Sequence, residues 1–142
     1  MPTTPRSVLA LDVGSKRIGV AIASLIARLP RPLITLNATD AQLLSTLEDI
    51  IADENVGRLV VGLPRGMEGQ QTSQTESTLR FSERLKTRFD MPIDMQDEAL
   101  TSKHAEEELQ SRDKPYKPGD IDALAATYIL EDWFSEHTKA AN

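Results

Sequence analysis

The sequence contains no cysteine and only two histidines among its 142 residues. The absence of cysteine excludes a disulfide framework, thiolate zinc sites and cysteine nucleophiles. His104 and His137 lie far apart in the sequence and do not form the spacing of a zinc site. A metal site built on cysteine or histidine is therefore not expected.

Aromatic residues and long apolar runs are also scarce. Aromatic residues make up 4% of the chain, so the core is expected to consist of Leu, Ile, Val and Ala. The longest apolar run, IGVAIASLIA, is about half of the ~20 residues that cross a bilayer, and no signal peptide is visible. These features predict a cytoplasmic protein with no membrane association. The length predicts one domain over residues 1–142, with a flexible tail from about residue 137.

The charge balance is acidic, with a formal net charge of −6. A general nucleic-acid-binding protein usually has a basic excess, so the total charge argues mildly against that class. The basic residues nevertheless cluster, in three groups: Lys16 and Arg17; Arg28 and Arg31; and Arg112, Lys114 and Lys117. A segregated surface with a basic patch is one interpretation, and ordinary solvated helix faces are the other.

Hydrophobic periodicity predicts an alternating order of strands and helices. Strands are expected over 8–13, 18–24, 33–36 and 58–64, with a fifth inside 91–98. Helices are expected over 41–54, around Leu79 to Leu85, over 99–110 and over 120–134, whereas 64–77 is expected to be an exposed loop. Three leading strands followed by this alternation indicate an α/β protein with a mixed sheet and helices on both of its faces.

Acidic residues stand at three element ends that are otherwise apolar. Asp12 lies late in the first strand, Asp97 and Glu98 close the fifth, and Asp120 and Asp122 open the last helix. Ligands of open α/β sheets collect at such ends. Converging carboxylates would repel one another unless a cation lay between them, and oxygen ligands suit Mg²⁺ or Mn²⁺. One or two such ions can promote hydrolysis of a phosphodiester.

Each of these acids also has a simpler interpretation. Asp12 could start a turn, Asp97 and Glu98 could cap the helix that follows them, and Asp120 and Asp122 could cap or begin the last helix. Strand alternation groups Asp97 with Ile93 and Met95, and Glu98 with Asp94 and Gln96. The residues alone do not choose between Asp97 and Glu98.

Four segments in order, LDVGSKRIGVA, VVGLPRGMEG, DEALTS and DIDALAATYIL, resemble the YqgF/RuvX family of Holliday junction resolvases. The resemblance implies a ribonuclease H-like fold, with a mixed five-stranded sheet of order 3-2-1-4-5 whose strands 1 to 3 are antiparallel. It implies a Mg²⁺-dependent nuclease whose catalytic and metal-binding acids are Asp12, Glu98 and Asp122. The family is also associated with maturation of the 5′ end of pre-16S ribosomal RNA. Gly66 stands where many members carry Asn, which affects only the contacts of that loop.

Basic and aromatic residues near these segments are candidate contacts with nucleic acid. They could equally be ordinary surface charges. The candidates are Lys16, Arg17, Arg65, Lys114, Tyr116 and Lys117.

Two other functional classes remain open at this point. An actin-like nucleotide-binding ATPase also opens with an Asp-x-Gly turn, but it needs a second, duplicated domain. A ribosome-assembly factor could keep the fold and bind RNA without cutting it. The sequence does not choose between precursor ribosomal RNA and branched DNA as the substrate, nor between a monomer and a homodimer.

Overall fold

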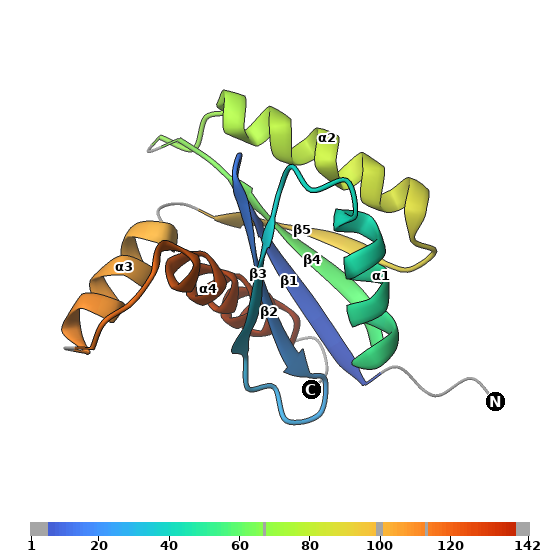
Figure 1. The fold of residues 1–142 in the computed structure, drawn as a ribbon, viewed down its shortest axis with the longest axis horizontal. Coiled ribbons are helices and arrows are strands. Elements are labelled where there is room, and N and C mark those ends of the chain that lie inside the picture. The colour runs from blue at the N-terminus through green and yellow to red at the C-terminus, as the bar shows by residue number, and fades with distance from the viewer. Residues whose placement is uncertain (1–5, 67, 99–100, 113, 139–142) are drawn as a thin grey trace.

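The computed structural model describes residues 6–66, 68–98, 101–112 and 114–138. Five strands form one sheet in the order β3-β2-β1-β4-β5, and four helices pack around it (Figure 1). The strands are β1 (Ser7–Val13), β2 (Arg17–Ser24), β3 (Arg31–Asn37), β4 (Val56–Pro64) and β5 (Ile93–Glu98). The helices are α1 (Leu43–Asp53), α2 (Ser73–Arg88), α3 (Thr101–Ser111) and α4 (Pro118–Thr138).

The sheet is mixed, as predicted. β1, β2 and β3 are antiparallel neighbours, whereas β4 is parallel to β1 and β5 is parallel to β4. This order and these orientations are the ones that the resemblance to ribonuclease H-like proteins implies. Because β1, β4 and β5 are parallel, their carboxyl ends meet at one edge of the sheet.

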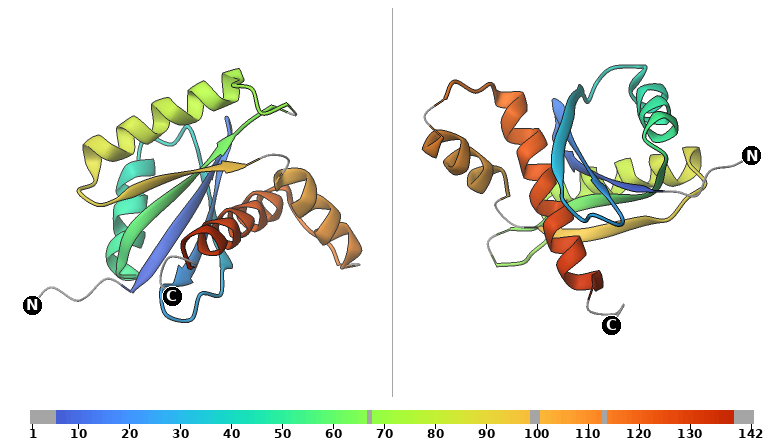
Figure 2. Two further views of the ribbon diagram at one scale, coloured as in Figure 1. Left: turned by 180° about the vertical axis from the view of Figure 1, so that it is seen from behind. Right: turned by 90° about the horizontal axis from the view of Figure 1, so that it is seen from below.

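Helices cover both faces of the sheet (Figures 1 and 2). Larger side chains of β1, such as Leu9 and Leu11, pack in one cluster with α1 and α2. The alternate positions of β1 and β2 carry small residues, Ala10 and Ala21, and pack against α4. Strand alternation therefore gives the sheet one bulky face and one shallow face, on which a single helix approaches closely.

Two adjacent faces of α4 have different partners. Ala126, Ile129 and Trp133 lie in the cluster with the sheet, whereas Leu124 and Ala125 pack with α3. A helix that is apolar on both of these sides is held between two neighbours, so the position of its first turns is well determined.

The structure differs from the predicted elements mainly at α2. This helix begins at Ser73, inside the segment predicted to be a loop, because Thr72 and Thr75 form a reciprocal capping box. Its first buried positions are Thr75 and Thr78, which apolar periodicity does not detect. α4 continues through Thr138, two residues into the predicted tail, whereas the first two residues of the predicted helix 99–110 lie outside the described residues.

Among the described residues, no helix is both long enough and apolar enough to span a membrane.

Candidate active site

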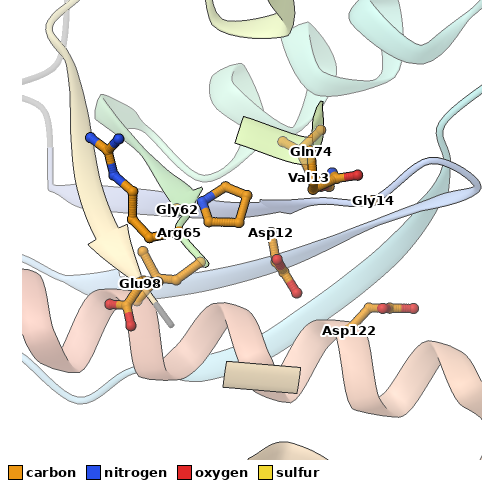
Figure 3. Close-up of a pocket in the computed structure, with 10 residues that line it drawn as sticks. Asp12, Val13, Gly14, Gly62, Arg65, Gln74, Glu98 and Asp122 are labelled. Atoms are coloured by element: carbon orange, nitrogen blue, oxygen red, sulfur yellow. The ribbon is translucent and has the colours of Figure 1, made fainter. Parts of the chain in front are cut away.

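The three acids that the resemblance singled out line one cavity at the carboxyl edge of β1, β4 and β5 (Figure 3). Asp12 comes from β1, Glu98 from the last position of β5 and Asp122 from the second turn of α4. In Figure 3 the Asp12 carboxylate lies between the other two. The cavity has a volume of about 230 Å³, and Arg65 and Gln74 also line it.

Strand alternation explains why Glu98, and not Asp97, faces this cavity. Asp94, two pleats before Glu98, accepts a hydrogen bond from Trp133 of α4 at 2.8 Å, so this set of β5 side chains lies on the α4 face. Met95, which shares the parity of Asp97, packs with the α1 and α2 cluster on the opposite face. Asp97 is 69% exposed and forms an ion pair with Arg65 at 3.2 Å.

A close approach of two backbones positions Asp122. Gly19 of β2 pairs with Asp12 of β1 in the sheet register. A Cβ atom at Gly19 would lie 2.0 Å from the carbonyl oxygen of Asp122, which no side chain could accommodate without movement. Glycine at position 19 therefore allows α4 to bring Asp122 beside Asp12.

Asp120, the other acid at this end of α4, has a structural role. Its carboxylate accepts a hydrogen bond from the backbone N–H of Lys117 at 2.9 Å, at the start of the helix. Asp120 lies in the first turn rather than at the N-cap, and Asp122 lies beyond that turn, so both helix-start interpretations shift by a few positions.

The surroundings of Asp12 disfavour its charged form. Burial raises the pKa of Asp12 from 3.8 to about 6, and the charge of Asp122 adds to the effect. Asp122 itself accepts a hydrogen bond from the Arg17 guanidinium at 2.6 Å. Arg17 therefore neutralises Asp122, whereas Asp12 forms no ion pair with any of the described residues.

Glu98 is even more strongly perturbed. Burial raises the pKa of Glu98 to about 9, assisted by a hydrogen bond with Asp132 and by the charges of Asp132, Glu136 and Asp12. Its Oε1 atom is buried and has no hydrogen-bond partner among the described residues. Protonation and cation binding are alternative ways to neutralise such a carboxyl group.

The donor chemistry of the cavity suits a hard divalent cation. All three acids offer oxygen, one of those oxygens is buried without a hydrogen-bond partner among the described residues, and burial together with the charge of Asp122 raises the pKa of Asp12. Within the described part of the chain, however, no three acidic or histidine side chains are close enough to form a ready-made metal cage. The acids therefore share a cavity but would have to draw together around an ion.

Comparison with known proteins identifies the family of this chain. A family model described as RuvX, Holliday junction resolvase, matches residues 6–136. The chain belongs to the RuvX family.

Curated members and a solved structure are similar to this RuvX-family chain. A protein of Chloroflexus aurantiacus is 39% identical over 138 residues, covering 95% of this chain and 90% of the relative. One of Crocosphaera subtropica is 39% identical over 133 residues, covering 92% and 93%. Both carry the name "Putative pre-16S rRNA nuclease". Thermus thermophilus RuvC, solved in complex with a Holliday junction substrate, matches with a TM-score of 0.49 and 14% identity over 92% of this chain and 95% of RuvC.

The remaining predicted contacts of this RuvX-family chain lie in different places. Arg65 lines the cavity, and Arg17 reaches it through Asp122. Lys16 is exposed in the β1–β2 turn and is outside the cavity lining. Lys114 and Tyr116 line a separate cavity beside α3 and α4, where Tyr116 also packs on the apolar cluster of those helices.

Lys117, the last predicted contact, is exposed at the start of α4, and its backbone N–H binds Asp120. Neither cavity includes Lys117 in its lining. The structure thus brings Arg17 and Arg65 to the three acids and places the segment 114–117 elsewhere.

The sequence did not predict two residues near the three acids. Gln74 lines the cavity, and its side-chain amide donates a 2.7 Å hydrogen bond to the carbonyl oxygen of Val13. It lies in the segment predicted to be a loop, so recognition of the Thr72–Thr75 capping box was the signal that could have found it. Asp132, the partner of Glu98, is ten positions beyond Asp122 on α4, and no local pattern relates it to β5.

Proposed function

We propose that this protein is a metal-dependent nuclease that hydrolyses phosphodiester bonds of structured nucleic acid. Processing of the 5′ end of pre-16S ribosomal RNA and resolution of Holliday junctions are the two activities that the relatives' names and the family description support. The observation that carries the proposal is the cavity at the sheet edge, where Asp12, Glu98 and Asp122 gather from three elements beside Arg65.

In this proposal the acids hold Mg²⁺, with Mn²⁺ as the alternative ion, through carboxylate oxygens. When bound, the ion would supply activation of water and stabilisation of the charge that develops on the reacting phosphate. A bound cation would stabilise the charged forms of Asp12 and Glu98 most, because burial disfavours a negative charge on both carboxyl groups when no cation is near them.

The basic residues would position the substrate. Arg65 is held at the cavity by its ion pair with Asp97 and by the hydrogen bond of its backbone N–H to the Glu98 carbonyl oxygen at 3.1 Å. A guanidinium fixed in this way can bind a phosphate oxygen of the scissile strand. Arg17, whose side chain is 45% exposed, would offer a second positive charge at the same rim.

The decisive experiment compares the wild-type protein with the Asp12→Asn variant on a pre-16S RNA fragment and on a four-way DNA junction, each with Mg²⁺ and with chelator. Cleavage by the wild type that requires Mg²⁺ and is lost in Asp12→Asn is the expected result. The Asp120→Asn variant is the matched control, because it makes the same chemical change at an acid that lies outside the cavity.

Other results would redirect the proposal. Cleavage that survives in Asp12→Asn would refute the metal-acid mechanism. Tight RNA binding without cleavage by the wild type would favour a non-catalytic ribosome-assembly factor. Nucleotide binding measured by calorimetry would revive the ATPase class.

The proposal extends to the setting of the protein. We place it in the cytoplasm, where bacterial precursor ribosomal RNA is processed, with nucleic acid as its partner. A single ribonuclease H-like domain is sufficient for the cavity, because one chain supplies all three acids. Sedimentation with and without a four-way junction would distinguish a monomer from the homodimer that symmetric cleavage of a junction requires.

A further inference from the structure

A second cavity adjoins the candidate active site. It lies between the β1–β2 turn and α2, has a volume of about 410 Å³, and shares Val13, Gly14 and Gln74 with the first cavity. We call it the α2 groove. Its polar lining consists of Ser15, Gln74, Ser77, Arg80 and Arg84. Because Gln74 stands at the boundary, a ligand that leaves the active site on this side enters the α2 groove directly.

Arg80 and Arg84 are the unusual members of this lining. Spaced four residues apart, they lie on the same face of α2, about 6 Å apart along the helix axis. Arg80 donates a hydrogen bond to the Ser77 hydroxyl at 3.2 Å, and the Arg84 guanidinium lies 5.5 Å from the centre of the Phe81 ring. Neither arginine forms an ion pair with a carboxylate within the described residues.

The absence of a carboxylate partner distinguishes these two arginines from their neighbour. Arg88, one turn further along α2, forms an ion pair with Glu48 at 3.2 Å. In a chain with a formal net charge of −6, two adjacent arginines without acidic partners create a local positive potential that the overall composition does not predict. Contacts with Ser77 and Phe81 restrict both side chains beforehand, which lowers the entropy cost of binding an anion.

The rest of the groove suits a nucleotide chain. Serine hydroxyls and guanidinium groups bind phosphate oxygens. Ile18, Ala38 and Phe81 give the same cavity an apolar part, which suits the sugar or the edge of a base. A phosphodiester backbone is the ligand that presents both kinds of surface at regular intervals.

We infer that the α2 groove binds the backbone phosphates of the nucleic-acid strand that flanks the scissile phosphate, through Arg80 and Arg84. This inference rests on the proposed nuclease function, because it is the continuity with that site which identifies the ligand as a polynucleotide. The groove would thus hold substrate on the side of Gln74, at a distance from the three acids.

The test measures binding with chelator present, so that no strand is cut. Fluorescence anisotropy would follow a labelled pre-16S RNA fragment and a labelled four-way DNA junction at several salt concentrations. For the double variant Arg80→Ala/Arg84→Ala we expect at least a ~10-fold weaker affinity, since each charged hydrogen bond contributes substantially. The slope of log affinity against log salt should become shallower by about 1.4–1.8, the value for two lost phosphate contacts.

Two further variants separate charge from packing. Arg88→Ala makes the same change on the same helix at a residue paired with Glu48, and it should bind both probes as the wild type does. Arg80→Lys/Arg84→Lys keeps both charges and should keep the wild-type salt slope. Loss of affinity for one probe alone identifies whether the groove receives RNA or DNA.

The outcomes of the inference and of the proposed function can be told apart. If the double alanine variant is folded and retains wild-type affinity and salt slope for both probes, the inference is overturned, even where the wild type cleaves them with Mg²⁺. If the variant loses affinity while the wild type cleaves neither probe, the groove stands as a binding site and the proposed nuclease function fails.

Discussion

Replacing Gly19 with alanine should strongly lower the cleavage rate of this protein while the protein still folds. Gly19 lies in β2, opposite Asp12 in the sheet register, and directly under the backbone of Asp122. An alanine Cβ at this position would lie 2.0 Å from the Asp122 carbonyl oxygen and 2.8 Å from the Ala123 nitrogen. These atoms are helix backbone, so no side-chain rotation can relieve the contact.

The size of the required movement follows from these distances. Real Cβ atoms essentially never come within 3.0 Å of such atoms, so α4 and β2 must separate by about 1 Å or more at this point. Overpacking of this kind costs about 1–3 kcal/mol. A displacement of about 1 Å in a catalytic group commonly lowers the rate about 100-fold. We therefore expect Gly19→Ala to lower the melting temperature by roughly 3–10 °C and the cleavage rate by about 100-fold.

The assay compares cleavage of pre-16S RNA and of a four-way DNA junction by folded protein, at temperatures well below the melting transition. Gly119→Ala is the matched control. Its Cβ would lie an ordinary 3.5 Å from Thr35, and it also introduces alanine near the start of α4. Gly119→Ala should keep wild-type activity. A Gly19→Ala protein with wild-type activity and stability would show that the close approach of α4 does not position Asp122.

The other predictions concern protonation and a distant ion pair. The pKa of Asp12 is 3.8 in the unfolded chain and about 6 in the folded protein, so the folded protein binds more protons between these two pH values. Without metal, the contribution of Asp12 to the free energy of unfolding should therefore fall by about 3 kcal/mol as the pH rises through this window. Urea titrations should show a fall that is about 3 kcal/mol smaller in Asp12→Asn, in which the raised pKa of Glu98 still lowers the free energy of unfolding over this window, and an equal fall in the variant would contradict the assignment. Glu98→Gln should be more stable than the wild type at pH 8. With a pKa raised from 4.5 to about 9, Glu98 must take up a proton when the wild type folds at this pH, and glutamine avoids that cost. A less stable variant would argue against this. Added Mg²⁺ should raise the melting temperature of the wild type but not of Asp12→Asn, and an equal rise in both would place the ion elsewhere. Asp94→Ala removes the carboxylate that accepts hydrogen bonds from Arg58 and Trp133 at the opposite end of β5 from Glu98. The variant should lose about 1–3 kcal/mol in the free energy of unfolding, measured by chemical denaturation, and should cleave as fast as the wild type when folded. Slower cleavage by the folded variant would contradict this prediction.

Local patterns predicted most of the fold. The sequence pattern located all five strands and, apart from the start of α2, the helices near their observed bounds, because each element buries one stripe or face. The start of α2 was missed because its buried positions are threonines and its signal is a capping box rather than a hydrophobic repeat. The order and direction of the strands came from the resemblance, since local periodicity carries no information on which strands pair.

The candidate site was likewise predicted in part from the sequence and in part only seen in the tertiary structure. The sequence by itself placed acids at the ends of β1 and β5 and at the start of α4, and the resemblance selected Asp12, Glu98 and Asp122 from among them. The tertiary structure shows where these acids lie: α4 packs on the small-residue face of the sheet, so strand alternation directs Glu98 toward α4 and Asp97 away from it. It also decided that Arg17 pairs with Asp122 and that Asp132 faces Glu98, because these contacts join segments far apart in the chain, and their distances depend on packing rather than on spacing.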